Sequence, residues 1–155
     1  MSSEVKISSV TLHSVTPTCV AELLSLMQAY YAYDHLDFNH GRAAAAVAEF
    51  VENPSLGHAW FVEVSGQRAG YLLLTFGTCL EFHGRTAVVD EFFITESFRG
   101  QGLGPKVLRM VEEFCREAGM KAMRLEVEHE NAKAQRVYER FGFKTHARHL
   151  MTKVL

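Results

Sequence analysis

The segment from residue 93 to residue 114, FITESFRGQGLGPKVLRMVEEF, constrains the fold of this chain more than any other. It contains an apolar strand-like run, a short loop with glycines at 100, 102 and 104, and a run whose apolar residues recur at helical spacing. Glycine leaves backbone N–H groups uncovered, and the first turn of a helix has N–H groups without partners. Arg99 and Lys106 add positive charge on either side. The segment therefore predicts a phosphate or pyrophosphate site, unless the loop only connects a strand to a helix.

Two common phosphate-binding motifs do not fit this loop. The Walker motif needs Lys and then Ser or Thr directly after its last glycine, and the sequence has Pro105 there. The dinucleotide motif G-x-G-x-x-G ends on Pro105 when it is started at Gly100, and on Val107 when it is started at Gly102. Pro105 itself suits the first turn of a helix, because its missing N–H would have no partner there.

The rest of the chain predicts strands and helices in one domain that spans residues 1–155. Periodicity and turn residues indicate, in order, strand 5–12, a helix opening at Pro17, helix 42–51, strands 58–64, 69–80 and 86–95, a helix from the glycine loop to about 117, strand 123–127, helix 131–141 and a final extended segment 143–155. This order predicts an α/β domain of the α+β type, in which helices flank a mixed sheet.

Composition narrows the class of protein. With 48% hydrophobic and 22% charged residues, the chain is typical of a soluble domain. Its net charge of −2 without a basic block gives no reason to expect nucleic acid, and no apolar run approaches the ~20 residues of a membrane helix. The polar start lacks the apolar core of a signal peptide. Three widely spaced cysteines favour reduced thiols, and the scattered histidines favour no metal site. We expect a cytoplasmic protein without metal, nucleic-acid or membrane partners.

The loop sequence from Arg99 to Gly104 resembles the acetyl-CoA pyrophosphate motif of the GNAT N-acetyltransferase superfamily: Gln or Arg, two residues, Gly, one residue, then Gly or Ala. The upstream strand VVDEFFI and the downstream segment NAKAQRVYERFGF resemble the neighbouring motifs of that family, and the order of elements matches over nearly the whole chain. Small bacterial acetyltransferases and the diamine or spermidine acetyltransferases are the most similar in pattern. The resemblance implies a GNAT-like, mostly antiparallel sheet with a splayed strand pair, and acetyl-CoA as the acetyl donor.

The resemblance also implies which residues hold the donor. The strand backbone at Phe92, Phe93 and Ile94 would pair with the pantetheine arm, while the strand from Arg124 to Val127 would splay away from it. The phosphate cradle would comprise Arg99, Gly100, Gln101, Gly102, Leu103, Gly104 and Pro105. Asn131 matches a position that contacts the cofactor in this family, although Asn is equally suited to cap the helix that follows.

Three side chains are candidates for the chemistry. Tyr138 matches a tyrosine beside the cofactor sulfur, where a phenol would protonate the departing thiolate; the alternative is a core tyrosine packed next to Phe141. Asp90 and Glu91 are candidates for the base that takes a proton from the amine. Neighbouring strand residues point to opposite faces, so only one of them should face the acceptor unless a bulge intervenes. Either acid could instead pair with a nearby Arg.

The acceptor site is predicted around the connection between the first two helices. Aromatic faces and carboxylates there suit a cation, and the candidates are Tyr30, Tyr31, Tyr33, Asp34, Glu81 and Asp90. The alternative is a solvated surface loop. We expect an acetyl-CoA-dependent N-acetyltransferase acting on a primary amine of a small molecule. A protein or peptide amine acetyltransferase, a non-catalytic acyl-CoA-binding module, a purely structural domain and a homodimeric state are left open.

Overall fold

The structure is a computed structural model that describes residues 9–155. Its strands are β1 (Val10–Ser14), β2 (Gly57–Val64), β3 (Gln67–Cys79), β4 (Gly84–Ile94) and β5 (Ala122–Leu125). Its α-helices are α1 (Val20–Tyr33), α2 (His40–Glu52), α3 (Leu103–Glu117) and α4 (Ala132–Phe141). Single turns of 3-10 helix are η1 (Pro17–Cys19), η2 (Leu80–Phe82) and η3 (Glu96–Phe98). In this part of the chain, no helix is long and apolar enough to cross a membrane.

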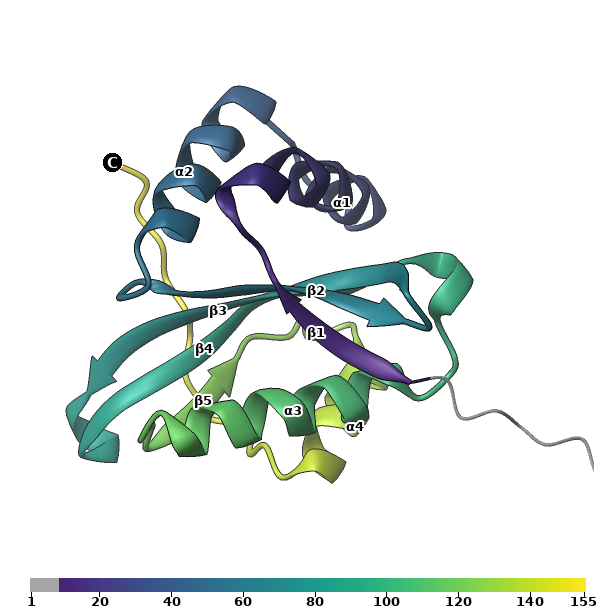
Figure 1. The fold of residues 1–155 in the computed structure, drawn as a ribbon. Helices are drawn as coiled ribbons and strands as arrows, with labels where there is room; N and C mark the ends of the chain where they lie inside the picture. Colours follow the sequence, from purple (N-terminus) through teal and green to yellow (C-terminus); the bar gives the residue numbers. More distant parts are fainter. Residues whose placement is uncertain (1–8) are drawn as a thin grey trace, which may run out of the picture.

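One sheet with the strand order β1-β2-β3-β4-β5 divides the molecule into two layers (Figure 1). The first four strands pair antiparallel, and β5 pairs parallel to β4. Helices α1 and α2 cover one face of the sheet, and α3 and α4 cover the other (Figure 1). The predicted α/β domain with a mixed, mostly antiparallel sheet flanked by helices is confirmed.

Alternation along the strands assigns side chains to the two layers. In β3, Leu72 and Leu74 pack into the core beneath α3, whereas Tyr71 and Leu73 pack into the core beneath α1 and α2. Because helices cover both faces, this strand is a continuous apolar run rather than an apolar–polar alternation. Helices α1 and α2 therefore lie over the segment of β4 that contains Asp90 and Glu91.

Strand β5 pairs with β4 over its whole length and then ends. Their pairing runs from Thr86 opposite Ala122 to Val89 opposite Leu125. Strand β4 continues to Ile94, paired only with β3. Of the segment expected to splay away, Arg124 and Leu125 are paired with β4 instead, and the edge of β4 beyond Val89 has no strand beside it in the described chain.

Two sequence predictions about the chain ends need correction. Of the first predicted strand, residues 5–8 lie outside the described residues, and the strand that is seen extends to Ser14. The final segment 143–155 was predicted to be extended, as a last strand, but within the described residues it forms no strand. It makes no ladder with β5, and its apolar side chains at Leu150, Met151 and Leu155 are exposed. Arg148 ties it to Glu81 of η2 through two hydrogen bonds of 3.0 Å.

Candidate active site

The loop that precedes α3 exposes its backbone. Gly100 and Gly102 have φ angles of +73° and +71°, a region that favours glycine, and Gly102 is the N-cap of α3. The N–H groups of residues 100–104 donate to no acceptor in the described part of the chain. A Cβ added at Gly100, Gly102 or Gly104 would meet no heavy atom within 4 Å. The loop thus presents a row of unpaired donors at a helix N-terminus, which is the arrangement that binds anions.

Arg99 does not point freely into this loop. Its Nε donates to the carbonyl oxygen of Ile94 at 2.8 Å, and its guanidinium carbon lies 4.0 Å from the centroid of the Tyr33 ring. It also lies 5.3 Å from the ring centroid of Phe93. Arg99 therefore fastens the loop to the end of β4 and to α1.

The edge of β4 supplies a second set of backbone groups. From Glu91 to Ile94 the strand is paired with β3 on one side, and β5 has already ended on the other. An extended, amide-bearing arm can add to such an edge as an extra strand. The sequence prediction for Phe92, Phe93 and Ile94 required an open edge of this kind, and the structure has one.

Asp90 is the extra residue of a β-bulge. Leu73 pairs with Glu91 and Leu74 pairs with Val89, which leaves Asp90 without an opposite residue. The bulge cancels the alternation that would otherwise send these neighbours to opposite faces. Both acids consequently line one cavity of about 250 Å³ between the sheet and the α1–α2 layer.

The two acids have different surroundings in that cavity. Glu91 accepts hydrogen bonds from the hydroxyls of Tyr71 at 2.8 Å and Tyr31 at 3.1 Å. Burial raises the pKa of Glu91, the two phenol bonds oppose that rise, and the Asp90 charge adds to it. Asp90 has no hydrogen-bond partner among the described side chains, and the protein atoms around it raise its pKa as well. No described Arg or Lys pairs with either acid, so the ion-pair alternative is wrong for these residues.

The predicted acceptor tyrosines lie on α1 itself rather than in the connection that follows it. Tyr31 lines the cavity, and burial together with Glu91 raises its pKa to about 12. Tyr30 packs against Tyr71 and Phe93 with ring centroids 6.4 and 5.5 Å away. Asp34 is the C-cap of α1. Of the predicted acceptor residues, only Tyr31 and Asp90 line the cavity; Glu81 is paired with Arg148 instead.

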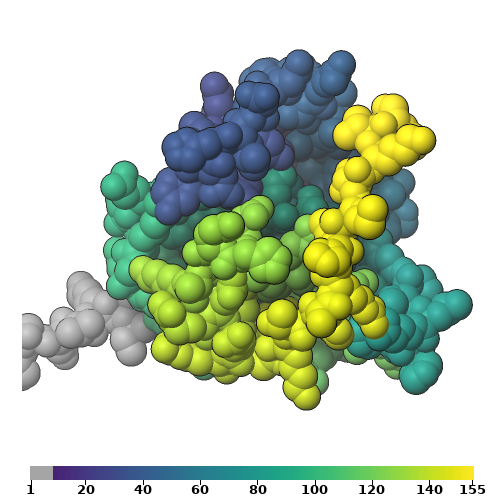
Figure 2. Space-filling view, turned by 180° about the vertical axis from the view of Figure 1, so that it is seen from behind, coloured from purple at the N-terminus to yellow at the C-terminus, as the bar shows by residue number. Residues whose placement is uncertain are grey.

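The two remaining candidates are Asn131, the N-cap of α4, and Tyr138, within α4. The side chain of Asn131 accepts from the N–H of Ala134 at 3.1 Å, so it caps the helix as its alternative interpretation required. Tyr138 is half-buried, burial raises its pKa, and its ring meets Phe143 edge-on at 5.9 Å rather than Phe141. Figure 2 shows a recess between the α1–α2 layer and the segment that runs from β5 into α4, bordered by the C-terminal segment.

Sequence analysis missed two contributors to the cavity at Asp90 and Glu91. One is Tyr71, whose only signal was a tyrosine inside the apolar run of β3. The other is the inner face of α2, where Ala43, Ala46, Val47 and Phe50 line the cavity. Their spacing of three and four residues places them on one side of a helix, but nothing local indicates what that side covers.

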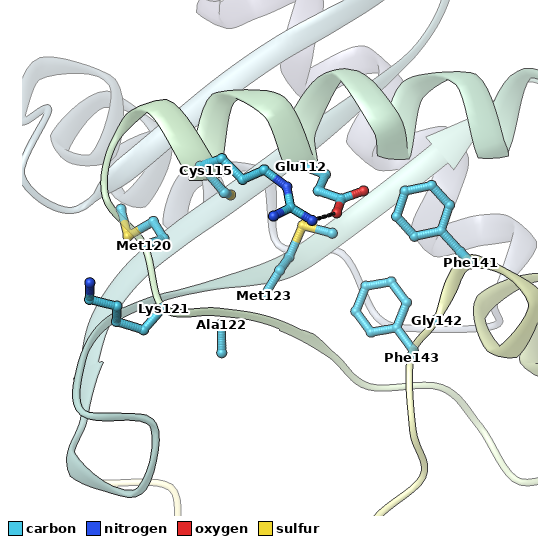
Figure 3. Close-up of a pocket in the computed structure, with 10 residues that line it drawn as sticks. Glu112, Cys115, Met120, Lys121, Ala122, Met123, Phe141, Gly142 and Phe143 are labelled. Atoms are coloured by element: carbon cyan, nitrogen blue, oxygen red, sulfur yellow. Dashed lines mark hydrogen bonds and ion pairs between the residues drawn. The ribbon is translucent and has the colours of Figure 1, made fainter.

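A second groove of about 230 Å³ lies on the other layer, between α3, β5 and the start of the C-terminal segment. Figure 3 shows Cys115 on α3, Met123 on β5 and Phe143 around it. Burial raises the pKa of the Cys115 thiol to about 11, so this cysteine is not a ready nucleophile. An ion pair of Glu112 with Arg116 lies at this groove, which carries no unpaired acid.

Comparisons with known proteins agree with this geometry. The model of the acetyltransferase (GNAT) family matches residues 21–143. A Bacillus subtilis protein named as an alanine N-acetyltransferase of ribosomal protein bS18 is 33% identical over 99 residues, which cover 61% of this chain and 58% of that protein. The spermine/spermidine N(1)-acetyltransferase of the same species is 38% identical over 56 residues, covering 36% of this chain and 37% of that protein. The chain thus spans less than two thirds of the length of these relatives.

Solved structures extend the likeness over nearly the whole chain. An integron cassette protein from the mobile metagenome of Cole Harbour Salt Marsh superimposes with a TM-score of 0.81 at 29% identity, covering 93% of this chain and 90% of that one. An aminoglycoside N-acetyltransferase in complex with CoA superimposes with a TM-score of 0.77 at 15% identity, covering 97% of each chain. The second likeness concerns the fold alone.

Proposed function

The chain belongs to the acetyltransferase (GNAT) family, and from this premise we propose that it transfers the acetyl group of acetyl-CoA to the primary amine of a small molecule. The observation that carries the proposal is the β-bulge at Asp90. Because of this bulge, the side chains of Asp90 and Glu91 both line one cavity, beside the open edge of β4. An amine needs a negatively charged site and a proton acceptor there, and the cavity contains both.

The donor side of the proposal rests on the backbone. The unpaired N–H groups of residues 100–104 would bind the pyrophosphate of acetyl-CoA, and Arg99 would add positive charge next to it. The open edge of β4 at residues 91–94 would pair with the pantetheine arm and bring its thioester towards the acids. A glycine loop that merely linked β4 to α3 would need neither the open edge nor the unpaired donors.

On the acceptor side we assign the base to Asp90. Its carboxylate oxygens are free, whereas both oxygens of Glu91 already accept a phenol hydrogen. The amine arrives as an ammonium ion held by the two acids, and Asp90 removes one proton, directly or through a water. The neutral nitrogen then forms the amide bond with the acetyl carbon, the carbon–sulfur bond breaks and the thiolate departs. The nitrogen, which keeps two protons on attack, releases one of them to solvent as the amide forms.

Tyr138 would complete the proton balance. The departing thiolate needs one proton to become a thiol, and a phenol beside it can supply that proton. A phenol is protonated at neutral pH at its ordinary pKa, and burial raises the pKa of Tyr138 further, so its hydroxyl holds a proton to donate; solvent then returns that proton to the phenolate. The net reaction converts an ammonium ion and acetyl-CoA into an amide, a free thiol and one released proton.

Release of free CoA from acetyl-CoA, measured against a panel of amines, tests the proposal. We expect Asp90→Asn to lower turnover strongly and Asp37→Asn to leave it unchanged, because Asp37 lies outside the cavity on the surface between α1 and α2. If acetyl-CoA binds but no amine in the panel promotes CoA release, the chain is an acyl-CoA-binding module and the proposal is wrong.

One observation favours a second acceptor class. The relative that matches 99 residues of this chain is named for acetylation of a ribosomal protein alanine. Peptides with an N-terminal alanine therefore belong in the same panel, as the main alternative to a small amine. A kcat/KM for such peptides above that of every small amine would replace the small-molecule acceptor with a protein one.

A further inference from the structure

The wall of the acceptor cavity opposite the acids is apolar. On α2, Ala43, Ala46, Val47 and Phe50 follow one another at intervals of three, one and three residues, so they share one helix face. Met27 of α1 completes this wall, which we call the α2 wall, and Leu73 of β3 adds apolar surface beside Glu91, its partner in the β3–β4 pairing. Alanine methyl groups at two of its positions leave the space that larger side chains would fill.

Charge in the cavity is confined to one end. Among the described residues that line it, Asp90 and Glu91 are charged, Tyr31 and Thr75 carry hydroxyls, and there is no Lys, Arg or His. The acids of α2, Glu49 and Glu52, are exposed and do not line the cavity. The site therefore has an unneutralised negative end and an uncharged remainder.

Because charge is confined to one end of the cavity, the site discriminates between amines by the group that each carries at the end away from the reacting nitrogen. A carboxylate on the acceptor would lie near two acids without any cation to balance it. A second ammonium would lie at the α2 wall without an acid to pair with and would lose the contact that an apolar group makes there. An apolar body gains free energy from contact with the same surface. The favoured acceptor carries a single charge, and that charge is on the amine.

The volume sets the size of the apolar body. A cavity of roughly 150 Å³ holds one benzene ring. The cavity of about 250 Å³ has room for such a ring with a short alkyl arm, or for a chain of similar size.

We propose that the acceptor is a hydrophobic monoamine, of the arylalkylamine or alkylamine class, whose ammonium lies at Asp90 and Glu91 and whose body packs on the α2 wall. This inference rests on the proposed acetyl transfer and specifies its acceptor. It separates the chain from polyamine acceptors, which need a second negative site at the distance of their next ammonium, and from free amino acids.

Two pairs of matched acceptors test the inference with the full chain and acetyl-CoA. n-Hexylamine and 1,6-diaminohexane differ at the far end of the chain, and 2-phenylethylamine and phenylalanine differ by one carboxylate. We expect kcat/KM for hexylamine to exceed that for the diamine at least about tenfold, and for phenylethylamine to exceed that for phenylalanine by more. Equal values within either pair, or a preference for the diamine, would overturn the inference.

A pair of variants assigns the selectivity to the α2 wall. Ala46→Glu adds a carboxylate at a wall position that is itself solvent-accessible, so the fold tolerates it. We expect this variant to lower the hexylamine-to-diamine ratio at least about tenfold. Ala45→Glu makes the same change one residue earlier, at an exposed position that does not line the cavity, and should leave the ratio unchanged. A ratio that both variants change equally, or neither changes, would contradict the assignment.

Calorimetric binding of hexylamine and diaminohexane to the protein in the presence of CoA separates this inference from the proposed function. Tighter binding of the monoamine, weakened by Ala46→Glu but not by Ala45→Glu, supports the inference even if turnover is absent. Acetyl transfer to the diamine or to alanine peptides in preference to all monoamines refutes the inference and leaves the proposed activity intact. Absence of both binding and turnover with every monoamine refutes the inference as well.

Discussion

Replacing Gly104 with leucine should abolish donor binding while the protein still folds. Gly104 is the second residue of α3, has no positive φ, and a Cβ there would meet no heavy atom within 4 Å outside its chain neighbours. Leucine has a better helix propensity than glycine, by up to about 1 kcal/mol, but a side chain directly before Pro105 is crowded by the proline ring, so the two effects on stability oppose each other. The new side chain would occupy the space in front of the exposed N–H groups, where the pyrophosphate is proposed to bind.

The size of the lost ligand effect follows from mass action. A ligand at a hundredfold excess over its dissociation constant stabilises the folded state by about 2.7 kcal/mol. For a domain of this size each kcal/mol moves the melting temperature by roughly 2–4 °C, so acetyl-CoA should raise the melting temperature of the unchanged protein by roughly 5–11 °C. The Gly104→Leu variant should unfold cooperatively without acetyl-CoA and show no shift of its melting temperature with it.

Gly41 provides the matched control. It is the second residue of α2, as Gly104 is of α3, and a Cβ there would meet only Oδ1 of Asn39, at 3.7 Å. Gly41→Leu should therefore also fold and keep the full shift with acetyl-CoA. The assay is thermal unfolding with and without saturating acetyl-CoA. A Gly104→Leu variant that keeps the shift of the unchanged protein would refute the assignment of the donor to this loop.

Three further substitutions test the chemistry. Asp90→Asn should lower turnover by ~10²–10⁴-fold and remove the acid limb of the pH–rate profile; an unaltered profile would assign the base elsewhere. The raised pKa of Asp90 means that its contribution to stability is present at low pH and is lost as pH rises past the ordinary carboxyl range, so the same variant should melt at a higher temperature than the unchanged protein at pH 7. Tyr71→Phe removes a hydrogen bond that lowers the pKa of Glu91, so any part of the pH–rate profile that is due to Glu91 should move to higher pH. A profile that does not move would show that the titration of Glu91 does not affect turnover. Tyr138→Phe should keep acetyl-CoA affinity within about twofold and lower turnover by roughly 10–10³-fold, whereas a packing role would lower only the melting temperature.

Local chemistry was enough to predict the donor side. Left-handed φ angles at Gly100 and Gly102, and the apolar spacing of α3, are properties of a few consecutive residues, so they are visible in the sequence. The order of strands and helices and the open edge of β4 followed from the pattern and from the family resemblance. The residues on which the donor proposal depends could thus be named before any contact was known.

The cavity proposed to bind the acceptor could not be predicted from the sequence, because it depends on strand register and on packing between distant elements. Whether Asp90 and Glu91 share a face is decided by a bulge, and a bulge depends on how β3 pairs with β4 rather than on either strand alone. The hydroxyl of Tyr71 and the methyl groups of α2 reach the cavity from elements distant in the sequence. The C-terminal segment had the composition of a strand but found no partner in the described chain, because a strand exists only through its neighbour. The sequence by itself determined the donor loop, whose structure is local, and only the tertiary structure decided the acceptor cavity, whose every wall comes from a different element.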